Sequence, residues 1–118
     1  MRIKKPSSGE FHDRAIRTLE SKLKSKHHTL FKEFEYKYRG MHEADLLVIS
    51  NDKKYAYAYE VKTTNHYRGR KKAYKQLEAD EVFLRKRFKI KNVFKFYVHK
   101  AKGKEIKNGR EYKINYVE

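Results

Sequence analysis

Two neighbouring apolar stretches, separated by a few polar residues, constrain this chain most. The first runs from Ala44 to Ile49, and the second alternates tyrosine with alanine from Tyr55 before it ends at Lys62. Short runs rich in β-branched and aromatic residues are typical of strands, and the intervening Ser50-Asn51-Asp52 segment favours a turn. We therefore predict strands at about 44–50 and 54–63 that pair as an antiparallel hairpin.

The rest of the chain predicts two helices and further strands. Ser7 and Glu10 have the spacing of a capping box, and apolar residues then recur at helical intervals. The predicted elements are helices at about 8–26 and 71–88 and strands at about 30–38, 93–98 and 112–116. The order of helix, three strands, helix and one or two strands indicates one α/β domain over residues 1–118, with residues 1–6 and the final one or two residues flexible.

The charge of the chain indicates the kind of partner it binds. Lys and Arg number 31 against 15 Asp and Glu, which gives a formal net charge of +16. A surface this basic favours a polyanion such as nucleic acid. No apolar run approaches the roughly 18 residues of a membrane-spanning helix, and the first residues lack the apolar segment of a signal peptide. We therefore expect a soluble, intracellular, cytoplasmic protein that binds no membrane.

Cysteine is absent from the chain, which limits the metals it can hold. Any metal must be bound by carboxylates, carbonyl oxygens or histidine, and this favours Mg2+ or Mn2+. The many Lys, Glu and Tyr residues, with few thermolabile ones, are typical of a protein from a thermophile or its virus.

A glutamate two residues before a lysine occurs five times, at Glu20, Glu35, Glu60, Glu105 and Glu111. The pair at Glu20 lies on a predicted helix, where residues two apart do not face each other. Among the pairs on predicted strands, only Glu60 and Lys62 follow an apolar strand that is headed by an acid, Asp45. Glu60 and Lys62 share one strand face about 6.6 Å apart, and the hairpin brings Asp45 to the same end of the sheet. Two carboxylates there can hold a hard divalent cation.

These residues resemble a known family of enzymes. Asp45, fourteen intervening residues and then Glu60-Val61-Lys62, between two predicted helices, are similar to the motif of the PD-(D/E)xK nuclease superfamily, which includes archaeal Holliday-junction resolvases and RecB-type exonucleases. The resemblance covers roughly residues 8–100, with Ala44 in place of the proline before the first acid. It implies a restriction-endonuclease-like αβββαβ core, in which helices flank a mixed central sheet.

The resemblance also implies a role for each motif residue. Asp45 and Glu60 would bind Mg2+ or Mn2+ together with the carbonyl oxygen of Val61. Lys62 would orient the attacking water and offset the charge that develops on the phosphate. A divalent ion lowers the pKa of a bound water and neutralises charge on the phosphate, which is why this chemistry uses one.

Family members add a ligand from the first helix, either Glu or His, and the chain offers both in Glu10 and His12. The apolar stripe of Phe11, Ala15 and Leu19 centres near His12, whereas Glu10 lies almost opposite. We therefore predict that His12 faces the sheet as a metal ligand and catalytic residue, with Glu10 as the alternative ligand. Two other interpretations stay open: Glu10 only completes the capping box, and His12 is a hydrogen-bonded core residue.

Gln76, the only glutamine of the chain, lies on the second predicted helix. RecB-like nucleases carry a Gln-x-x-x-Tyr element at a similar place, and here Asp80 stands at the tyrosine position. The resemblance predicts Gln76 as a catalytic, substrate-contacting residue, and the alternative is a surface helix former. Asp80 and Glu81 interrupt the predicted apolar stripe of this helix.

A basic segment after Lys62 is predicted to form a loop that binds the nucleic-acid backbone. Its members are His66, Tyr67, Arg68, Arg70, Lys71 and Lys72. The cations match phosphates, and the tyrosine can stack on a base or donate a hydrogen bond. No element typical of base reading is present, so we expect little base specificity.

The function expected from these residues is that of a Mg2+-dependent deoxyribonuclease, a hydrolase of phosphodiester bonds in DNA. One alternative is a Holliday-junction-resolving endonuclease that acts as a homodimer. Another is a non-catalytic basic protein that binds nucleic acid. A member of the same fold that acts on RNA also stays open, since the residues do not separate RNA from DNA.

Overall fold

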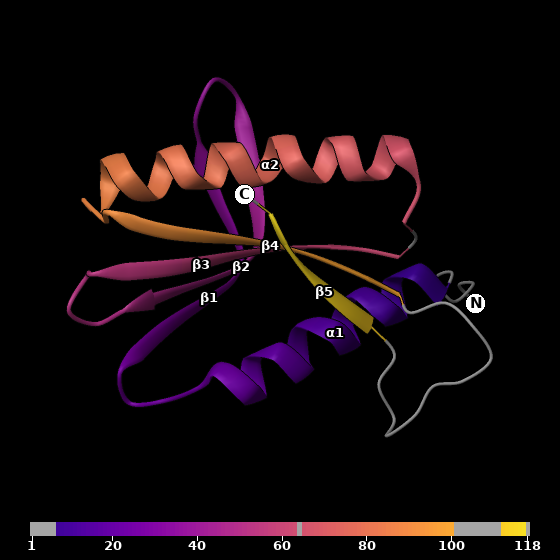
Figure 1. The fold of residues 1–118 in the computed structure, drawn as a ribbon, viewed down its shortest axis with the longest axis horizontal. Coiled ribbons are helices and arrows are strands. Elements are labelled where there is room, and N and C mark those ends of the chain that lie inside the picture. The colour runs from indigo at the N-terminus through magenta and orange to yellow at the C-terminus, as the bar shows by residue number, and fades with distance from the viewer. Residues whose placement is uncertain (1–6, 64, 101–111, 118) are drawn as a thin grey trace, which may run out of the picture.

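The computed structural model describes residues 7–63, 65–100 and 112–117, with side chains described from residue 11 onwards and, in the last segment, from residue 113. Two helices enclose a mixed five-stranded sheet, so that the described part is a three-layer α/β domain (Figure 1). The elements are α1 (Ser7–Leu23), β1 (His28–Lys37), β2 (Met41–Ser50), β3 (Tyr55–Lys62), α2 (Tyr67–Arg87), β4 (Asn92–Lys100) and β5 (Tyr112–Val117).

The strands lie in the sheet in the order in which they occur in the chain. β1, β2 and β3 form an antiparallel meander, because short turns join them. β4 is parallel to β3, and α2 makes the long connection that a parallel pair needs. β5 returns antiparallel to β4. The predicted hairpin of β2 and β3 is therefore confirmed.

Each face of the sheet carries its own apolar cluster. The face under α1 buries Phe11, Ala15, Ile16 and Leu19 of the helix against Leu46, Val48, Tyr59, Val61 and Val98 of the strands. The face under α2 buries Leu77, Ala79 and Leu84 of the helix, with Ile90, against Tyr36, Ala44, Leu47, Ile49, Ala56, Ala58 and Val93. The alternation of side chains along β2 and β3 supplies both clusters from the same two strands.

The alternation breaks at one place, opposite Asp45. The register pairs Lys32 with Leu46 and Phe34 with Ala44, and Glu33 between them has a positive φ of 47°. Ala44 and Leu47 are three residues apart and would face opposite sides of a regular strand. Because of this break, both face α2. Asp45 therefore sits where the regular ladder of β2 is interrupted.

The structure corrects several predicted boundaries. α1 ends at Leu23 rather than near residue 26, and β1 and β2 begin at His28 and Met41, before the predicted starts. The largest difference is at α2, which begins at Tyr67 rather than 71. Tyr67, Arg68 and Arg70 of the basic segment are therefore helical rather than in a loop, because His66 caps the helix four residues earlier than the apolar pattern indicates.

Some expectations fall on residues that the structure does not describe. These are the flexibility expected of residues 1–6 and the glutamate–lysine pairs that begin at Glu105 and Glu111. Within the described ranges, neither helix combines the length and apolar character needed to cross a membrane.

The end of α2 has an unfavourable backbone position. Phe88 is the C-cap, and the next residue, Lys89, adopts a left-handed φ of 60°. The amide groups of Phe88 and Ile90 both donate to the carbonyl oxygen of Leu84, so the backbone must turn at Lys89 to close the helix end. A residue with a Cβ pays a steric cost in this conformation, whereas glycine does not.

We predict that Lys89→Gly stabilises the fold by about 1 kcal/mol, because it removes that cost from an exposed position. Urea denaturation followed by circular dichroism measures the change. The control is Lys86→Gly, also exposed but inside the last turn of α2, which should lower the stability by about 0.5–1 kcal/mol. A loss of stability in both variants would contradict the role of the left-handed position.

Candidate functional site

Asp45 lies at the fork where β2 and β3 part. The last ladder pair of these strands joins Leu46 to Tyr59, and one step further the Asp45 carboxylate takes the place of a backbone acceptor. Its Oδ2 accepts a hydrogen bond of 2.7 Å from the backbone N–H of Val61, and Asp45 is only 8% exposed. This bond fixes the Asp45 carboxylate beside the peptide that follows Glu60.

His12 of α1 binds the other oxygen of the same carboxylate. Its Nε2 lies 3.1 Å from Oδ1 of Asp45, and the hydrogen bond raises the pKa of His12 against the opposing effect of burial. His12 therefore faces the sheet, as its position on the apolar stripe predicts. Its role as a metal ligand stays a prediction, and the side chain of the alternative ligand, Glu10, lies outside the described residues.

Glu60 is buried with little compensation for its charge. It is 6% exposed, and its Oε1 has no hydrogen-bond partner among the described residues. The closest cation is Lys62, whose Nζ lies 3.9 Å from Oε2. Burial raises the pKa of Glu60 to about 10, and the charges of Asp45 and Asp80 add to this while Lys62 opposes it. Without a further cation, this carboxyl group holds its proton at neutral pH.

Asp80 of α2 is a third buried acid that sequence reasoning placed wrongly. It is fully buried and occupies the stripe of Ala73, Leu77 and Leu84 rather than interrupting it. Its spacing of three residues after Leu77 and four before Leu84 is the helical interval that could have revealed this. Burial raises the pKa of Asp80 to about 6, against hydrogen bonds that lower it.

A network of polar side chains holds one oxygen of Asp80. Oδ1 accepts hydrogen bonds from the Tyr36 hydroxyl at 2.5 Å and from the Gln76 amide at 2.7 Å. Burial and the bond to Asp80 raise the pKa of the Tyr36 hydroxyl, which keeps it a donor. Oδ2, in contrast, has no hydrogen-bond partner within the described ranges. Tyr36 was not among the predicted site residues, because its partner lies on a distant element.

Gln76 has its amide engaged inside the protein. Nε2 contacts both Asp80 and the Tyr36 hydroxyl, the latter at 3.1 Å, and Oε1 lies 3.0 Å from Nδ1 of His42. The His42 ring is held in turn by the carbonyl oxygen of Tyr38, 2.8 Å from its Nε2. Gln76 is thus half-buried rather than a surface helix former, and direct contact with a substrate would require this network to open.

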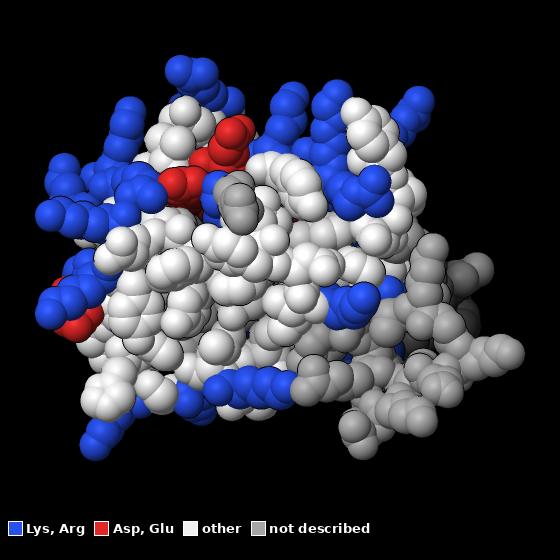
Figure 2. Space-filling model, in the orientation of Figure 1, with Lys and Arg blue, Asp and Glu red and all other residues white. Residues whose placement is uncertain are grey.

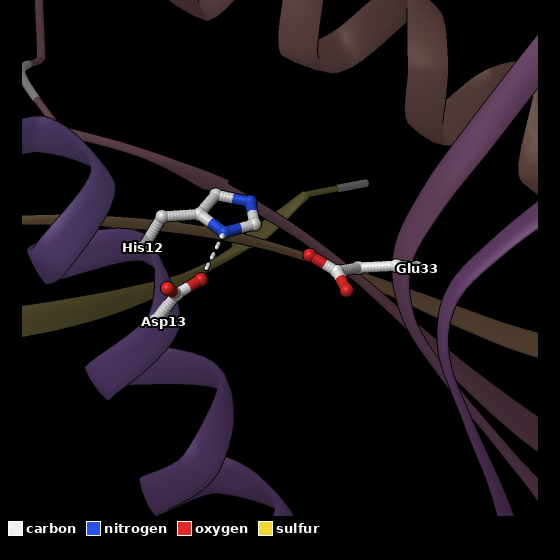
Figure 3. A group of neighbouring side chains, drawn as sticks. All are labelled: His12, Asp13 and Glu33. Atoms are coloured by element: carbon white, nitrogen blue, oxygen red, sulfur yellow. Dashed lines mark ion pairs between the residues drawn. The ribbon is translucent and has the colours of Figure 1, made fainter. Parts of the chain in front are cut away.

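A second group of side chains surrounds the outer side of His12. Figure 3 shows the Glu33 carboxylate of β1 pointing towards His12 and Asp13 of α1. One ligand atom from each of these three residues lies within 4.8 Å of the others, and His12 Nδ1 is 3.8 Å from Asp13. Asp13 and Glu33 are exposed, unlike the acids on the Nε2 side of the ring. Sequence reasoning missed both Asp13 and Glu33. For Glu33, the positive φ has no signal in the residue type.

The buried acids suit a hard divalent cation by the chemistry of their donors. Asp45, Glu60 and Asp80 offer carboxylate oxygens, and two of these oxygens, on Glu60 and Asp80, have no partner among the described residues. Mg2+ and Mn2+ prefer oxygen ligands of this type. The predicted contribution of the Val61 carbonyl stays a prediction, although the bond from its N–H places that peptide beside Asp45.

The basic segment begins α2 directly after the acids of β3. The His66 ring caps the helix by accepting a bond of 3.2 Å from the N–H of Gly69, and the first turn contains no acid. Tyr67 is 67% exposed, and Lys71 Nζ lies 5.9 Å from the centre of its ring. Arg70 binds two oxygens of Asn65. Figure 2 shows Lys and Arg gathered along the α2 side of the molecule, with a small group of acids among them.

Comparisons of the chain with protein families, curated proteins and solved structures find no match. The roles of the site residues are therefore inferred from the geometry of the site alone. Direct contacts link His12, Asp45 and the Val61 peptide, and Lys62 approaches Glu60. Gln76 belongs to the network around Asp80, whereas the basic segment forms a separate surface at the start of α2.

We predict that Glu60→Gln stabilises the metal-free protein, and that the gain grows with pH. Below about pH 4.5 both folded and unfolded Glu60 are protonated, so the substitution has no electrostatic effect. Between this value and about 10 the unfolded chain releases a proton that the folded chain keeps, so rising pH destabilises the wild type by up to about 1.4 kcal/mol per pH unit. Glutamine removes this loss.

Urea denaturation in the presence of EDTA, at several pH values from about 5 to 9, measures the difference between the two proteins. Glu78→Gln, an exposed acid of α2, is the control and should show no such growth. A stability difference between Glu60→Gln and wild type that stays constant over this range would contradict the raised pKa.

Proposed function

We propose that this chain is a metal-dependent nuclease of the PD-(D/E)xK type, which hydrolyses phosphodiester bonds in DNA with little base specificity. The order α1, β1, β2, β3, α2, β4 supports the proposal, because it is the order of the restriction-endonuclease-like core that the sequence resemblance implies. The two motif acids also lie next to each other, at the fork of β2 and β3.

One observation carries the proposal: acids with unpartnered oxygens are buried inside a chain of net charge +16. Burying carboxylates without a counter-ion costs free energy, and a fold that needed only stability would replace them. Lys62 lies 3.9 Å from Glu60 and His12 pairs with Asp45, which leaves two basic groups beside three acids. A bound divalent cation would supply the missing charge.

The side chains divide the work of hydrolysis. Asp45 and Glu60 would hold Mg2+ or Mn2+, which when bound activates water and neutralises charge on the phosphate. Lys62 extends from the same strand face as Glu60, so its ammonium group would orient the attacking water and offset charge on the phosphate. His12 and the Val61 amide hold the Asp45 carboxylate in place from two sides.

The start of α2 would bind the DNA backbone. Arg68, Lys71 and Lys72 lie in its first turns without an acid, and the exposed ring of Tyr67 lies at the same end. Cations there would pair with phosphates on either side of the cleaved bond. Contacts to phosphate carry no sequence information, which supports low base specificity.

We predict that the wild type cleaves DNA in Mg2+ or Mn2+ and not in EDTA. Asp45→Asn and Lys62→Met should each lower the cleavage rate by at least about 100-fold, because each removes a charge from the reacting centre. Asparagine can still accept the hydrogen bond from the Val61 N–H, so the contact between β2 and β3 at this point is kept. Glu78→Gln is the matched control outside the site and should cleave at the wild-type rate.

The assay compares a four-way junction, linear duplex, single-stranded DNA and RNA, with the products resolved on gels. Preferential cleavage of the junction by a dimer would indicate the Holliday-junction-resolving alternative. Undiminished cleavage by Asp45→Asn would contradict the assigned site. Binding without cleavage under every metal condition would favour the non-catalytic alternative.

We also predict that replacing Lys71 and Lys72 by alanine weakens DNA binding and flattens its dependence on salt. Loss of two phosphate contacts should reduce the slope of log affinity against log salt by about 1.8. Fluorescence anisotropy in an Asp45→Asn background measures binding without cleavage. The control replaces Lys24 and Lys26 by alanine. These two residues carry the same charge and follow the C-terminal end of α1, so the change should leave both affinity and slope nearly unchanged.

A further inference from the structure

The α1 side of the sheet carries a row of aromatic side chains that the helix covers only in part. Alternation places Tyr57 and Tyr59 of β3 on this side, together with two phenylalanines of β4 and two residues of β5. α1 buries Tyr59, which is 5% exposed, whereas Phe94 stays 37% and Tyr116 56% exposed. We define the aromatic face as Tyr55, Tyr57, Phe94, Phe96, Ile114 and Tyr116.

The rings of the aromatic face contact one another across three strands. Tyr57 lies 5.8 Å from both Phe94 and Phe96, measured between ring centres. Phe96 lies 5.7 Å from Tyr116 in the same measure. The register agrees with these contacts, because it pairs Tyr57 with Phe94 and Phe96 with Tyr116. The rings therefore form one continuous surface.

Exposed apolar side chains concentrate on this face. The described part of the chain exposes six large apolar or aromatic side chains, and three of them, Phe94, Ile114 and Tyr116, belong to the aromatic face. Single exposed apolar residues are normal on a protein, whereas a contiguous group of them marks a binding surface. The aromatic face is therefore a candidate binding surface.

The surroundings of the aromatic face are basic. At the end of the sheet where β3 and β4 begin, Lys53, Lys54 and Lys91 are exposed. One acid, Asp52, lies in the same turn, and its carboxylate accepts a hydrogen bond from the Ser50 hydroxyl. In Figure 2 the middle of the molecule, where Figure 1 places β4 and β5, is mostly white, and Lys and Arg gather above it and at its left. An uncharged centre with a basic rim fits a partner that has both apolar planes and negative charges.

This distribution of charge selects among the possible partners. A second copy of the chain would bring another net charge of +16 to the rim, and like charges oppose such a contact. Single-stranded DNA instead offers flat base faces to the rings and phosphates to the lysines. A duplex cannot use the rings in this way, because it presents only the edges of its bases in the grooves.

We propose that the aromatic face binds single-stranded DNA, with bases stacked on Phe94 and Tyr116. This inference rests on the proposed function for the choice of DNA, and it adds the form of the strand. Ala56 and Ala58 face α2, and alternation places Glu60 on their side of β3, opposite the aromatic face. The face would therefore anchor a strand away from the reacting centre. Stacking accepts every base, which agrees with low base specificity.

The first test compares the binding of single-stranded and duplex DNA of about 12 nucleotides by fluorescence anisotropy, in EDTA to prevent cleavage. Phe94→Leu and Tyr116→Leu should each weaken binding of the single strand at least about fivefold, because leucine stays apolar but has no ring face. Binding of the duplex should not change. Phe94→Tyr keeps a ring and should bind as the wild type does. Tyr74→Leu removes a ring of α2 that is 42% exposed and is the matched control, with no change expected for either DNA.

The second test reports stacking directly. The chain has no tryptophan, so Phe94→Trp introduces a single one. A base stacked on this indole should quench its fluorescence when single-stranded DNA is added, and duplex DNA should leave the signal unchanged. Tyr74→Trp carries its tryptophan outside the aromatic face and should show no quenching.

The outcomes separate this inference from the proposed function. Failure of the wild type to bind the single strand, or an equal effect of Phe94→Leu on both forms of DNA, would overturn the inference even if the wild type cleaves DNA. Single-strand binding that depends on Phe94 and Tyr116, in a protein that cleaves no DNA with any metal, would support the inference and overturn the proposed reaction. If a leucine variant fails to fold, quenching in Phe94→Trp decides.

Sedimentation of the wild type without DNA tests the other occupant of the face. A monomer is expected, because the like charges of two copies repel each other. A dimer that Tyr116→Lys dissociates would assign the aromatic face to a second copy of the chain and overturn the inference.

Discussion

The hydrogen bond from the Val61 backbone to the Asp45 carboxylate is the contact on which the rest of the site depends. It lies where β2 and β3 part, and the other oxygen of the same carboxylate binds His12 of α1. One side chain therefore ties a helix and two strands together at a single point. Because Val61 follows Glu60, the same bond sets the distance between the two motif acids. The geometry of the candidate site is thus a direct consequence of how the sheet opens, and Glu33, opposite Asp45, interrupts the ladder of β1 and β2 there without shifting its register.

The distribution of charge follows from the cost of burial. Thirty-one Lys and Arg residues give the chain its positive surface, since a long flexible side chain keeps its charge in water at little cost. The three buried acids, Asp45, Glu60 and Asp80, lie where few of these cations can follow. In these surroundings of low dielectric constant the charges of Asp45 and Asp80 add to the raised pKa of Glu60. In the proposed function this arrangement attracts the polyanion to the surface and a small cation to the interior, so that a phosphate at the edge of the site would meet both.

The sequence predicted the fold well where the determinants are local. The strand-like pattern of β2 and β3 and the helical spacing of apolar residues in α1 predicted the order of the elements. They also predicted the hairpin that brings Asp45 near Glu60. The start of α2 was predicted four residues late, because its first turn is polar and its cap is a histidine. The bond between Tyr36 and Asp80 spans 44 positions and has no local signal. Metal binding, with its ligands, and the reaction stay predictions. They depend on the charges of an ion and a substrate, which the chain itself does not supply.

Burying three acids costs free energy, mainly through desolvation, which other contacts must offset. The apolar clusters on the two faces of the sheet provide that offset, and both draw on β2 and β3, the strands that carry Asp45 and Glu60. Under the proposed function this cover would have a second effect, because a carboxylate exposed to water binds a divalent cation weakly, whereas buried carboxylates already held in place lose little entropy on binding it. Tyr36 and Gln76 hold Asp80 in place on the α2 side with neutral groups. Under the proposed function, helices on both faces of the sheet are therefore a condition for the site as well as for the core, because they exclude the water that would otherwise screen the acids from the proposed ion.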